Sequence, residues 1–388
     1  MNLAQELVGQ SRLPNVKTTI FSVMSQLAAE HGALNLSQGF PDFECPERLR
    51  ELVGEAMRSG HNQYAPMPGV PLLRLRIAEK VESLYHAKVD MDSEITITSG
   101  ATEALFVAIQ TVVRPGDEVI LFDPAYDSYE PAVELAGGKT IHLPLSAPDF
   151  RIDWQQLKDA ITAKTRLIVI NSPHNPTGSA MSPEDLDQLA DIIADSKTYL
   201  IGDEVYEHII FDRAEHQSLL RRDELRQRSF VISSFGKTYH TTGWKIGYCI
   251  APPPMTAEFR KIHQYVTFSI STPMQHAIAN FMADPSFHLE LPGFYQQKRD
   301  YFRSAVESSR FKLLPCRGTY FQLLDYQAIS DRQDMDMARW LVEEAGVAAI
   351  PVSVFYADQQ GSDHRILRFC FAKSNATLDQ AAERLCAL

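Results

Sequence analysis

Residue types that can do chemistry recur just after five short, β-rich apolar runs in the middle of this chain. A lysine offers an amine nucleophile, an aspartate can pair with a cation, and a Gly-Ala-Thr sequence that opens a helix can bind an anion through its backbone N–H groups. These residues are Ser99 to Thr102, Asp123 to Tyr126, Ser172 to Pro176, Asp203 to Tyr206, and Ser233-Ser234 followed by Lys237. Each group alone is typical of an ordinary connection or helix cap, so their recurrence is the informative feature.

Two lysines, Lys237 and Lys245, stand eight residues apart in the segment SSFGKTYHTTGWKIG. Gly236-Lys237-Thr238 matches the end of the phosphate-loop motif G-x-x-x-x-G-K-[ST], but the first glycine of that motif falls on Val231. The other Gly-Lys-Thr, at 138–140, fails in the same way because residue 133 is a valine. A nucleotide-binding loop is therefore excluded, and Lys237 needs another explanation.

The apolar runs alternate with helical patterns. Strand-like runs lie at 94–100, 119–124, 166–173, 199–205 and 229–234. Between them, segments such as 102–113 and 182–195 repeat their apolar residues with helical spacing, and Ser182 is a credible N-cap with Asp185 three residues later. This alternation predicts the α/β class, with a mostly parallel sheet between helices. Ligands of such sheets bind beyond the carboxyl ends of the strands, so we expect the five groups to meet at one edge.

Composition limits the classes of protein and partner. The chain has 388 residues, 45% hydrophobic and 22% charged, and its net charge of -12 without any Lys/Arg run disfavours nucleic-acid binding. The five cysteines are odd in number and widely spaced, so neither a disulfide framework nor a metal site is indicated. No signal-peptide core or membrane-spanning segment is apparent. We expect a cytoplasmic protein that acts on small molecules.

One cofactor needs all of these groups at once. Pyridoxal 5'-phosphate requires a lysine amine that forms a Schiff base, a helix N-terminus for its phosphate, a carboxylate for its pyridine nitrogen and a donor for its ring oxygen. The chain offers each of them, and it contains no G-x-S-x-G, H-E-x-x-H or G-x-G-x-x-G motif that would indicate other chemistry. The sequence therefore predicts a pyridoxal phosphate site.

Four ordered motifs, NSPHNPTG, GDEVYEH, SSFGKTYHTTGWKIGY and HRILRFCFAK, resemble those of the class I aminotransferases in the aspartate aminotransferase fold family. The resemblance covers nearly the whole chain. It implies fold type I of the pyridoxal-phosphate-dependent transferases, with a large cofactor domain at 41–285 and a smaller α+β domain formed by an N-terminal arm, 1–40, and by 286–388. It also implies a homodimer with shared sites, because Tyr64 resembles the tyrosine that reaches the cofactor phosphate of the other subunit.

The resemblance assigns roles to residues of the cofactor site. Lys237 matches the Schiff-base lysine and general base, Asp203 the carboxylate that keeps the pyridine nitrogen protonated, and Tyr206 the phenol on the ring oxygen. Asn175 matches the amide that contacts both this oxygen and the substrate carboxylate. Tyr126 matches the aromatic ring that stacks on the cofactor.

A phosphate cradle is expected where a helical pattern opens. Gly100, Ala101 and Thr102 supply backbone N–H groups and a hydroxyl at the positive end of the helix dipole, and the resemblance adds Ser234 and Lys245. Most of the family has an arginine at the position of Lys245. The lysine keeps the positive charge but cannot form the two parallel hydrogen bonds that a guanidinium makes.

Substrate recognition is expected to depend on Arg368, which matches the clamp for the α-carboxylate, with Arg365 as its nearby competitor. The backbone of Gly39 matches a further carboxylate contact. Dicarboxylate-specific enzymes of the family use a second arginine, supplied by the neighbouring subunit, on the segment that follows the lysine motif. In this chain that segment reads HQYVTFSISTPMQ and has no positive charge after His263. A neutral, large side chain is therefore favoured, and the candidate pocket walls are Phe21, Phe40 and Phe268.

The segments FSVMSQLA, NLSQGFPDF and QYAPMPG most resemble methionine aminotransferases close to the kynurenine aminotransferase and glutamine transaminase K branch. The implied reaction moves an amino group from methionine, an aromatic amino acid or glutamine to a 2-oxo acid in a ping-pong cycle. Two alternatives stay open. The same site could act as a carbon–sulfur β-lyase on cysteine conjugates, or the chain could be a cofactor-binding sensor domain.

Overall fold

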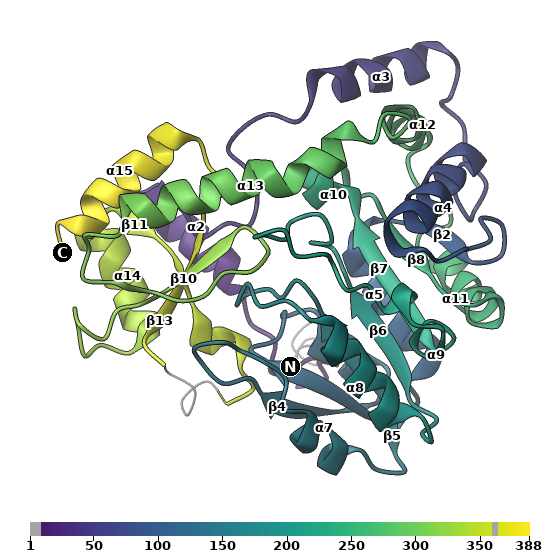
Figure 1. Cartoon of the computed structure of the whole chain (residues 1–388), viewed down its shortest axis with the longest axis horizontal. Helices are drawn as coiled ribbons and strands as arrows, with labels where there is room; N and C mark the ends of the chain where they lie inside the picture. Colours follow the sequence, from purple (N-terminus) through teal and green to yellow (C-terminus); the bar gives the residue numbers. More distant parts are fainter. Residues whose placement is uncertain (1–8, 359–363) are drawn as a thin grey trace.

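The computed structural model describes residues 9–358 and 364–388, and a seven-stranded sheet forms its centre (Figure 1). The expectation about a signal peptide concerns in part residues 1–8, which lie outside the described residues. In sheet order, the strands are β2 (Ile95–Thr98), β8 (Gly247–Ile250), β7 (Ser229–Ser234), β6 (Tyr199–Asp203), β5 (Thr165–Asn171), β3 (Glu118–Asp123) and β4 (Lys139–Pro144). Only β8 runs against its neighbours, so the carboxyl ends of the other strands share one edge.

Both faces of this sheet are buried, because its strands are continuous apolar runs. Along β3, Val119 and Leu121 pack on one face while Ile120 and Phe122 pack on the other. The first face is covered by α5 (Gly100–Val112), α6 (Tyr129–Leu135) and α11 (Pro253–Val266). The second is covered by α4 (Pro71–Tyr85), α7 (Trp154–Ala160), α8 (Pro183–Ile193) and α12 (Thr272–Phe281), with α3 (Glu47–Arg58) packed on α12. The predicted α/β class is confirmed.

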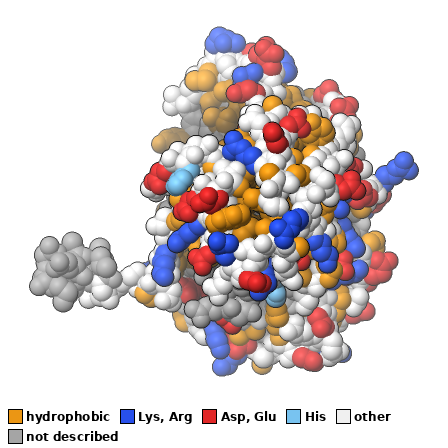
Figure 2. Space-filling model, turned by 90° about the vertical axis from the view of Figure 1, so that its left-hand side faces the viewer, with side chains coloured by type: hydrophobic (Ala, Val, Ile, Leu, Met, Phe, Trp, Pro, Cys, Tyr) orange, Lys and Arg blue, Asp and Glu red, His pale blue; other side chains and the backbone are white. Residues whose placement is uncertain are grey.

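A second, antiparallel sheet lies beside the first. It comprises β12 (Ile350–Pro351), β13 (Ile366–Cys370), β10 (Phe321–Asp325) and β9 (Lys312–Leu313), while β1 (Leu34–Asn35) pairs with β11 (Val347–Ala348). Its helices are α2 (Ile20–His31), α14 (Asp334–Ala345), α15 (Asn375–Cys386) and α13 (Ser286–Ala305), the last of which runs from this sheet towards α12 (Figure 1). Figure 2 views the side of the molecule where α14 and α15 lie. There charges of both signs are interspersed and hydrophobic side chains gather near the centre.

Local sequence signals agree with the elements formed. The Ser182 hydroxyl accepts from the Asp185 N–H and the Asp185 carboxylate accepts from the Ser182 N–H, which makes the capping box that starts α8. The short elements are η1 (Leu219–Arg221), α9 (Asp223–Arg226), α10 (Phe235–Thr238), η2 (Thr242–Trp244) and η3 (Val352–Phe355). Within the described residues, no helix is long and apolar enough to cross a membrane. The division into domains near residues 41 and 285 stays a prediction.

Candidate active site

A cavity of about 170 Å³ opens at the sheet edge where the parallel strands end. Ten of the predicted cofactor-binding residues line it: Gly100, Ala101, Thr102, Tyr126, Asn175, Asp203, Tyr206, Ser234, Lys237 and Lys245. They lie at or just after the carboxyl ends of β2, β3, β5, β6 and β7 or, for Lys245, just before β8, and these segments are distant in sequence but meet at one edge. The expectation that reactive residues gather at one edge is thus met by the tertiary structure.

Lys237 lies on α10, a single helical turn that follows β7 directly. The Ser234 hydroxyl accepts from the Gly236 N–H and so caps this turn. The Lys237 amine donates to the Gly39 carbonyl at 3.1 Å and to the Tyr320 hydroxyl at 2.9 Å. The pKa of Lys237 is lowered to about 8, chiefly by burial and in addition by the positive charges of Arg368 and Lys245, against the opposing effects of Cys370 and Asp203. A neutral amine is therefore within reach near neutral pH.

Asp203 ends β6 with its carboxylate in the cavity. Tyr129 donates its hydroxyl to Asp203 Oδ2 at 2.6 Å, and the Val205 N–H donates to Oδ1 at 3.4 Å. Burial raises the pKa of Asp203 to about 6, although both hydrogen bonds act in the opposite direction. A buried carboxylate of this kind gains from a cationic partner, which is what a protonated pyridine nitrogen provides.

Two supporting residues of Asp203 were missed from the sequence. Tyr129 begins α6, and its hydrogen bond to Asp203 joins positions 74 apart in the chain, so no local pattern identifies it. Asn171 pairs with Asp203 across β5 and β6, donates to the Asp203 carbonyl at 2.8 Å and accepts from the Asn175 N–H at 2.8 Å. Only the strand register identifies Asn171.

The start of α5 provides an anion cradle. Gly100 has a φ of 69° and Lys245 a φ of 54°, and the Lys245 amine lies 3.4 Å from the position that a Cβ on Gly100 would take. A Cβ on Gly247 would lie 2.9 Å from the Ala101 nitrogen, so β8 packs directly against this helix start. The free N–H groups of the first helical turn, together with the Lys245 charge, therefore face one end of the cavity.

Aromatic and amide side chains form the cavity walls. Tyr126 lies edge-on to Tyr129, with ring centroids 5.7 Å apart, and burial raises the pKa of its phenol to about 12. Tyr206 is buried, and its ring is edge-on to that of Tyr320 at 5.2 Å. Both phenols consequently stay protonated and can donate hydrogen bonds.

Arg368 borders the cavity through Asn175. Its side chain is almost wholly buried on β13, donating to Asn175 Oδ1 at 2.7 Å and to the Ser37 carbonyl at 3.0 Å. Its guanidinium lies 3.9 Å from the ring centroid of Phe321. Arg368 Nε has no hydrogen-bond partner in the described part of the chain, and burial lowers the pKa of the group. A buried cation with a free donor is suited to a substrate carboxylate. Arg365 instead pairs with Asp331 at 2.7 Å on the surface.

The remaining predicted residues form two groups, one beside Arg368 and Lys237 and one outside the cavity. Phe21 lies beside the Arg368 guanidinium at 5.3 Å, and the Gly39 carbonyl lies beside Lys237, so both reach the site. Phe40 is 45% exposed, with its ring 5.1 Å from the Lys373 amine. Tyr64 and Phe268 are 82% and 44% exposed and contact each other edge-on at 5.3 Å. None of these three lines the cavity within this subunit.

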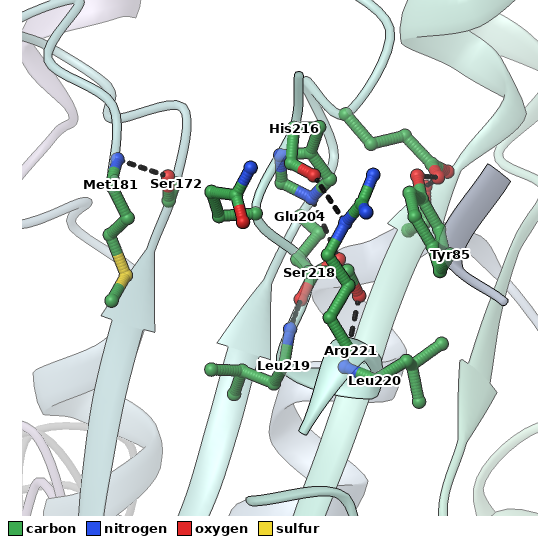
Figure 3. Close-up of polar contacts among 12 residues, drawn as sticks. Tyr85, Ser172, Met181, Glu204, His216, Ser218, Leu219, Leu220 and Arg221 are labelled. Atoms are coloured by element: carbon green, nitrogen blue, oxygen red, sulfur yellow. Dashed lines mark hydrogen bonds and ion pairs between the residues drawn. The ribbon is translucent and has the colours of Figure 1, made fainter. Parts of the chain in front are cut away.

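Buried carboxylates hold the segment that follows β6. Glu204 does not line the cavity. His216 Nε2 lies 2.8 Å from one oxygen of Glu204, and the Leu219 N–H donates to the other at 2.9 Å (Figure 3). Arg221 donates to the His216 carbonyl and lies over the ring of Tyr85 (Figure 3). These contacts fix the loop on which Tyr206 stands.

Glu207, on the same loop, joins four segments. One oxygen accepts from Lys80 and from Tyr248 at 2.7 Å each, and from Ser233, while the other accepts from Tyr85. Burial opposes its ionisation, but Lys80 and these hydrogen bonds hold the pKa of Glu207 well below its usual range. The carboxylate thereby ties α4, β7 and β8 to the end of β6.

The residues present fit pyridoxal phosphate. The cavity has an anion cradle at Gly100 to Thr102 and Lys245, a buried carboxylate at Asp203, an amine at Lys237 and phenol donors at Tyr126 and Tyr206. Within the described residues, no group of three or more His, Cys, Asp or Glu side chains is placed to hold a metal ion.

Comparisons with known proteins agree with this chemistry. The family model for class I and II aminotransferases, whose members depend in general on pyridoxal phosphate, matches residues 32–385. The chain is 52% identical to a methionine aminotransferase of Escherichia coli over 98% of both proteins, and 32% identical to human kynurenine–oxoglutarate transaminase 3 over 98% of this chain and 90% of that one. A solved Escherichia coli structure, reported to have a methionine aminotransferase function, superposes with a TM-score of 0.95 at 52% identity, covering 97% of this chain and 99% of that one. This chain is therefore a member of the class I and II aminotransferase family.

Proposed function

We propose that this protein is a pyridoxal-phosphate-dependent aminotransferase that takes its amino group from methionine, or from another large neutral amino acid, and passes it to a 2-oxo acid. The observation that carries the proposal is that Lys237 and the buried carboxylate of Asp203 line one cavity, which the buried guanidinium of Arg368 borders through its hydrogen bond to Asn175. The 52% identity to a methionine aminotransferase supports the choice of donor.

Each residue has a defined task. Arg368 and Asn175 bind the α-carboxylate and so orient the Cα–H bond. Gly100 to Thr102, Ser234 and Lys245 would hold the phosphate, Asp203 would hold the proton on the pyridine nitrogen, and Tyr206 would donate to the ring oxygen. When bound, the cofactor supplies a sink for the electron pair released at Cα. Lys237 in its neutral form accepts the α-proton at Nζ and later gives it back.

The preference for a neutral side chain follows from charge. Residues 264–275 contain no lysine or arginine, so an acidic side chain there would lose its hydration without gaining an ion pair. Phe21 and Phe355, whose centroids are 6.0 Å apart next to Arg368, offer apolar ring surface to which a thioether packs well.

We also propose a cytoplasmic homodimer with shared sites. All five cysteines are free thiols, as expected of a reducing compartment. Tyr64, Tyr265 and Phe268 expose 82%, 86% and 44% of their surfaces, an apolar area that a second copy would cover. Light scattering should give twice the subunit mass of 43.7 kDa, and a monomer at micromolar concentration would contradict this part of the proposal.

The testing experiment is the near-ultraviolet and visible absorbance of the purified protein with pyridoxal phosphate. We expect a band that bleaches with L-methionine and returns with a 2-oxo acid. A band that methionine leaves unchanged would refute the donor assignment, and release of pyruvate and ammonia from a cysteine conjugate would then identify the β-lyase alternative. No band at all would refute the role of Lys237.

A further inference from the structure

The Lys237 amine has two hydrogen-bond acceptors, and both come from outside the large sheet. The Gly39 carbonyl lies 3.1 Å from Nζ in the segment after β1, and the Tyr320 hydroxyl lies 2.9 Å away, one residue before β10. The Tyr320 hydroxyl also bonds to the Gly39 carbonyl, so the three polar groups form a closed triangle.

Hydrogen-bond chemistry fixes the directions within this triangle. A carbonyl oxygen can only accept, so the Tyr320 proton must go to Gly39, and the phenol oxygen must accept from Lys237. A neutral lysine amine has two N–H bonds and one lone pair. When both N–H bonds are directed to Gly39 and Tyr320, the lone pair is left pointing away from the triangle, on the side where Lys237 lines the cavity.

Packing keeps the phenol in place. Tyr320 is fully buried, and its ring lies within 4.9 to 5.6 Å of the rings of Phe321, Tyr206 and Tyr295. Gly39 lies so close to Phe321 that a Cβ atom on Gly39 would be only 2.9 Å from the Phe321 ring. Burial raises the pKa of the Tyr320 phenol well above its ordinary value, so the phenol keeps its proton for Gly39.

We propose that Tyr320 is a positioning residue of this enzyme, which together with the Gly39 carbonyl orients the freed Lys237 amine so that its lone pair takes the α-proton of the substrate. This rests on the proposed function. In that step the Cα–H bond breaks, an N–H bond forms at Nζ, and the electron pair of the broken bond stays with the substrate and the bound cofactor. The resulting ammonium keeps its bonds to Tyr320 and Gly39 and presents the new proton to the cavity.

The chain offers a matched control. Tyr295 belongs to the same aromatic cluster and is also fully buried, but its hydroxyl has no hydrogen-bond partner in the described part of the structure. Tyr320→Phe and Tyr295→Phe therefore each delete one buried phenol oxygen, and only Tyr320→Phe removes an atom that contacts Lys237.

The first readout needs no cofactor. Competitive acetylation of the cofactor-free protein at pH 7, read by peptide mass spectrometry with the exposed Lys88 as internal reference, reports how much Lys237 is unprotonated. Because a hydrogen bond to an ammonium is stronger than one to a neutral amine, losing Tyr320 destabilises the ammonium. Arg368, Lys245, Asp203, Cys370 and Tyr206 also face this amine and are unchanged in the variants. We expect Lys237 labelling to rise at least threefold in Tyr320→Phe and to stay unchanged in Tyr295→Phe.

The second readout is the kinetic isotope effect with α-deuterated methionine. We expect kcat of Tyr320→Phe to fall about 10- to 100-fold, with a larger isotope effect, because a misoriented base slows proton transfer. Wild-type labelling and isotope effect in Tyr320→Phe would overturn the proposal, as would equal effects in Tyr295→Phe. Failure of the wild-type protein to transaminate methionine would instead refute the proposed donor, while the labelling contrast would still decide whether Tyr320 holds the amine.

Discussion

Replacing Glu207 by glutamine should expose the cost of an uncompensated buried charge. Lys80 and Glu207 have 5% and 3% of their side-chain surfaces exposed, and the carboxylate is the ion-pair partner of the lysine at 2.7 Å. Glutamine keeps the shape and most hydrogen bonds but leaves Lys80 without its counter-charge. Removing one member of a buried pair costs about 3–5 kcal/mol, a large part of the roughly 5–15 kcal/mol that stabilises a typical domain.

The double variant Lys80→Met/Glu207→Leu should lose less stability than the sum of the losses in Lys80→Met and in Glu207→Leu. Replacing a buried pair by apolar residues of similar volume is by itself neutral or stabilising by about 1–4 kcal/mol, so the two positions should couple strongly. The hydroxyls of Tyr85, Tyr248 and Ser233 would lose their acceptor at a cost of about 1–3 kcal/mol for each buried group, so the double variant should still be less stable than the wild type.

The assay is urea unfolding of the cofactor-free protein followed by tryptophan fluorescence. Asp187→Asn provides the control. The side chains of Asp187 and Arg222 are 60% and 32% exposed, so their ion pair should contribute less than about 1 kcal/mol to the free energy of unfolding. If Glu207→Gln unfolds at the wild-type urea concentration, or if the effects of Lys80→Met and Glu207→Leu simply add in the double variant, the ion pair does not contribute to stability as argued and the reasoning is refuted.

Three further predictions concern the site and its surroundings. Lys237→Ala should bind pyridoxal phosphate noncovalently, as measured by dialysis, and should lose transamination, as measured by turnover. Near-normal turnover in this variant would refute the assignment of Lys237 as the Schiff-base lysine. Arg368→Ala should lose about 3–5 kcal/mol of transition-state binding, a factor of roughly 10² to 5 × 10³ in kcat/KM for every α-amino acid, and unchanged kinetics would move the carboxylate clamp elsewhere. Burial opposes protonation of His142, but its hydrogen bond to Asp123 and its ion pair with Glu130 raise its pKa to about 9. Because this lies above the unfolded value of about 6.5, the stability difference between wild type and His142→Gln should be constant below pH 6.5 and disappear as the pH rises towards 9. A difference in the stability of these two proteins that does not change with pH would contradict the assignment.

Local features of the site were accessible from sequence because they depend on neighbours in the chain. The strands are apolar runs, the capping box at Ser182 needs only a residue three positions later, and the cradle at Gly100 needs only a glycine that opens a helix. The order of strands and reactive residues along the chain, together with the resemblance to a known family, was sufficient for the fold class and for the prediction that Lys237, Asp203 and Arg368 belong to one site.

Contacts between distant segments were decided by the tertiary structure. Tyr320 reaches Lys237 across 83 positions and Arg368 reaches Asn175 across 193, and no local pattern encodes such pairs. Tyr129 and Asn171 support Asp203 only because of helix orientation and strand register. The sequence by itself determined which reactive groups this protein carries and on which kinds of element they stand. The tertiary structure determined their distances, their burial and hence their pKa values, because desolvation and hydrogen bonding depend on neighbours in space.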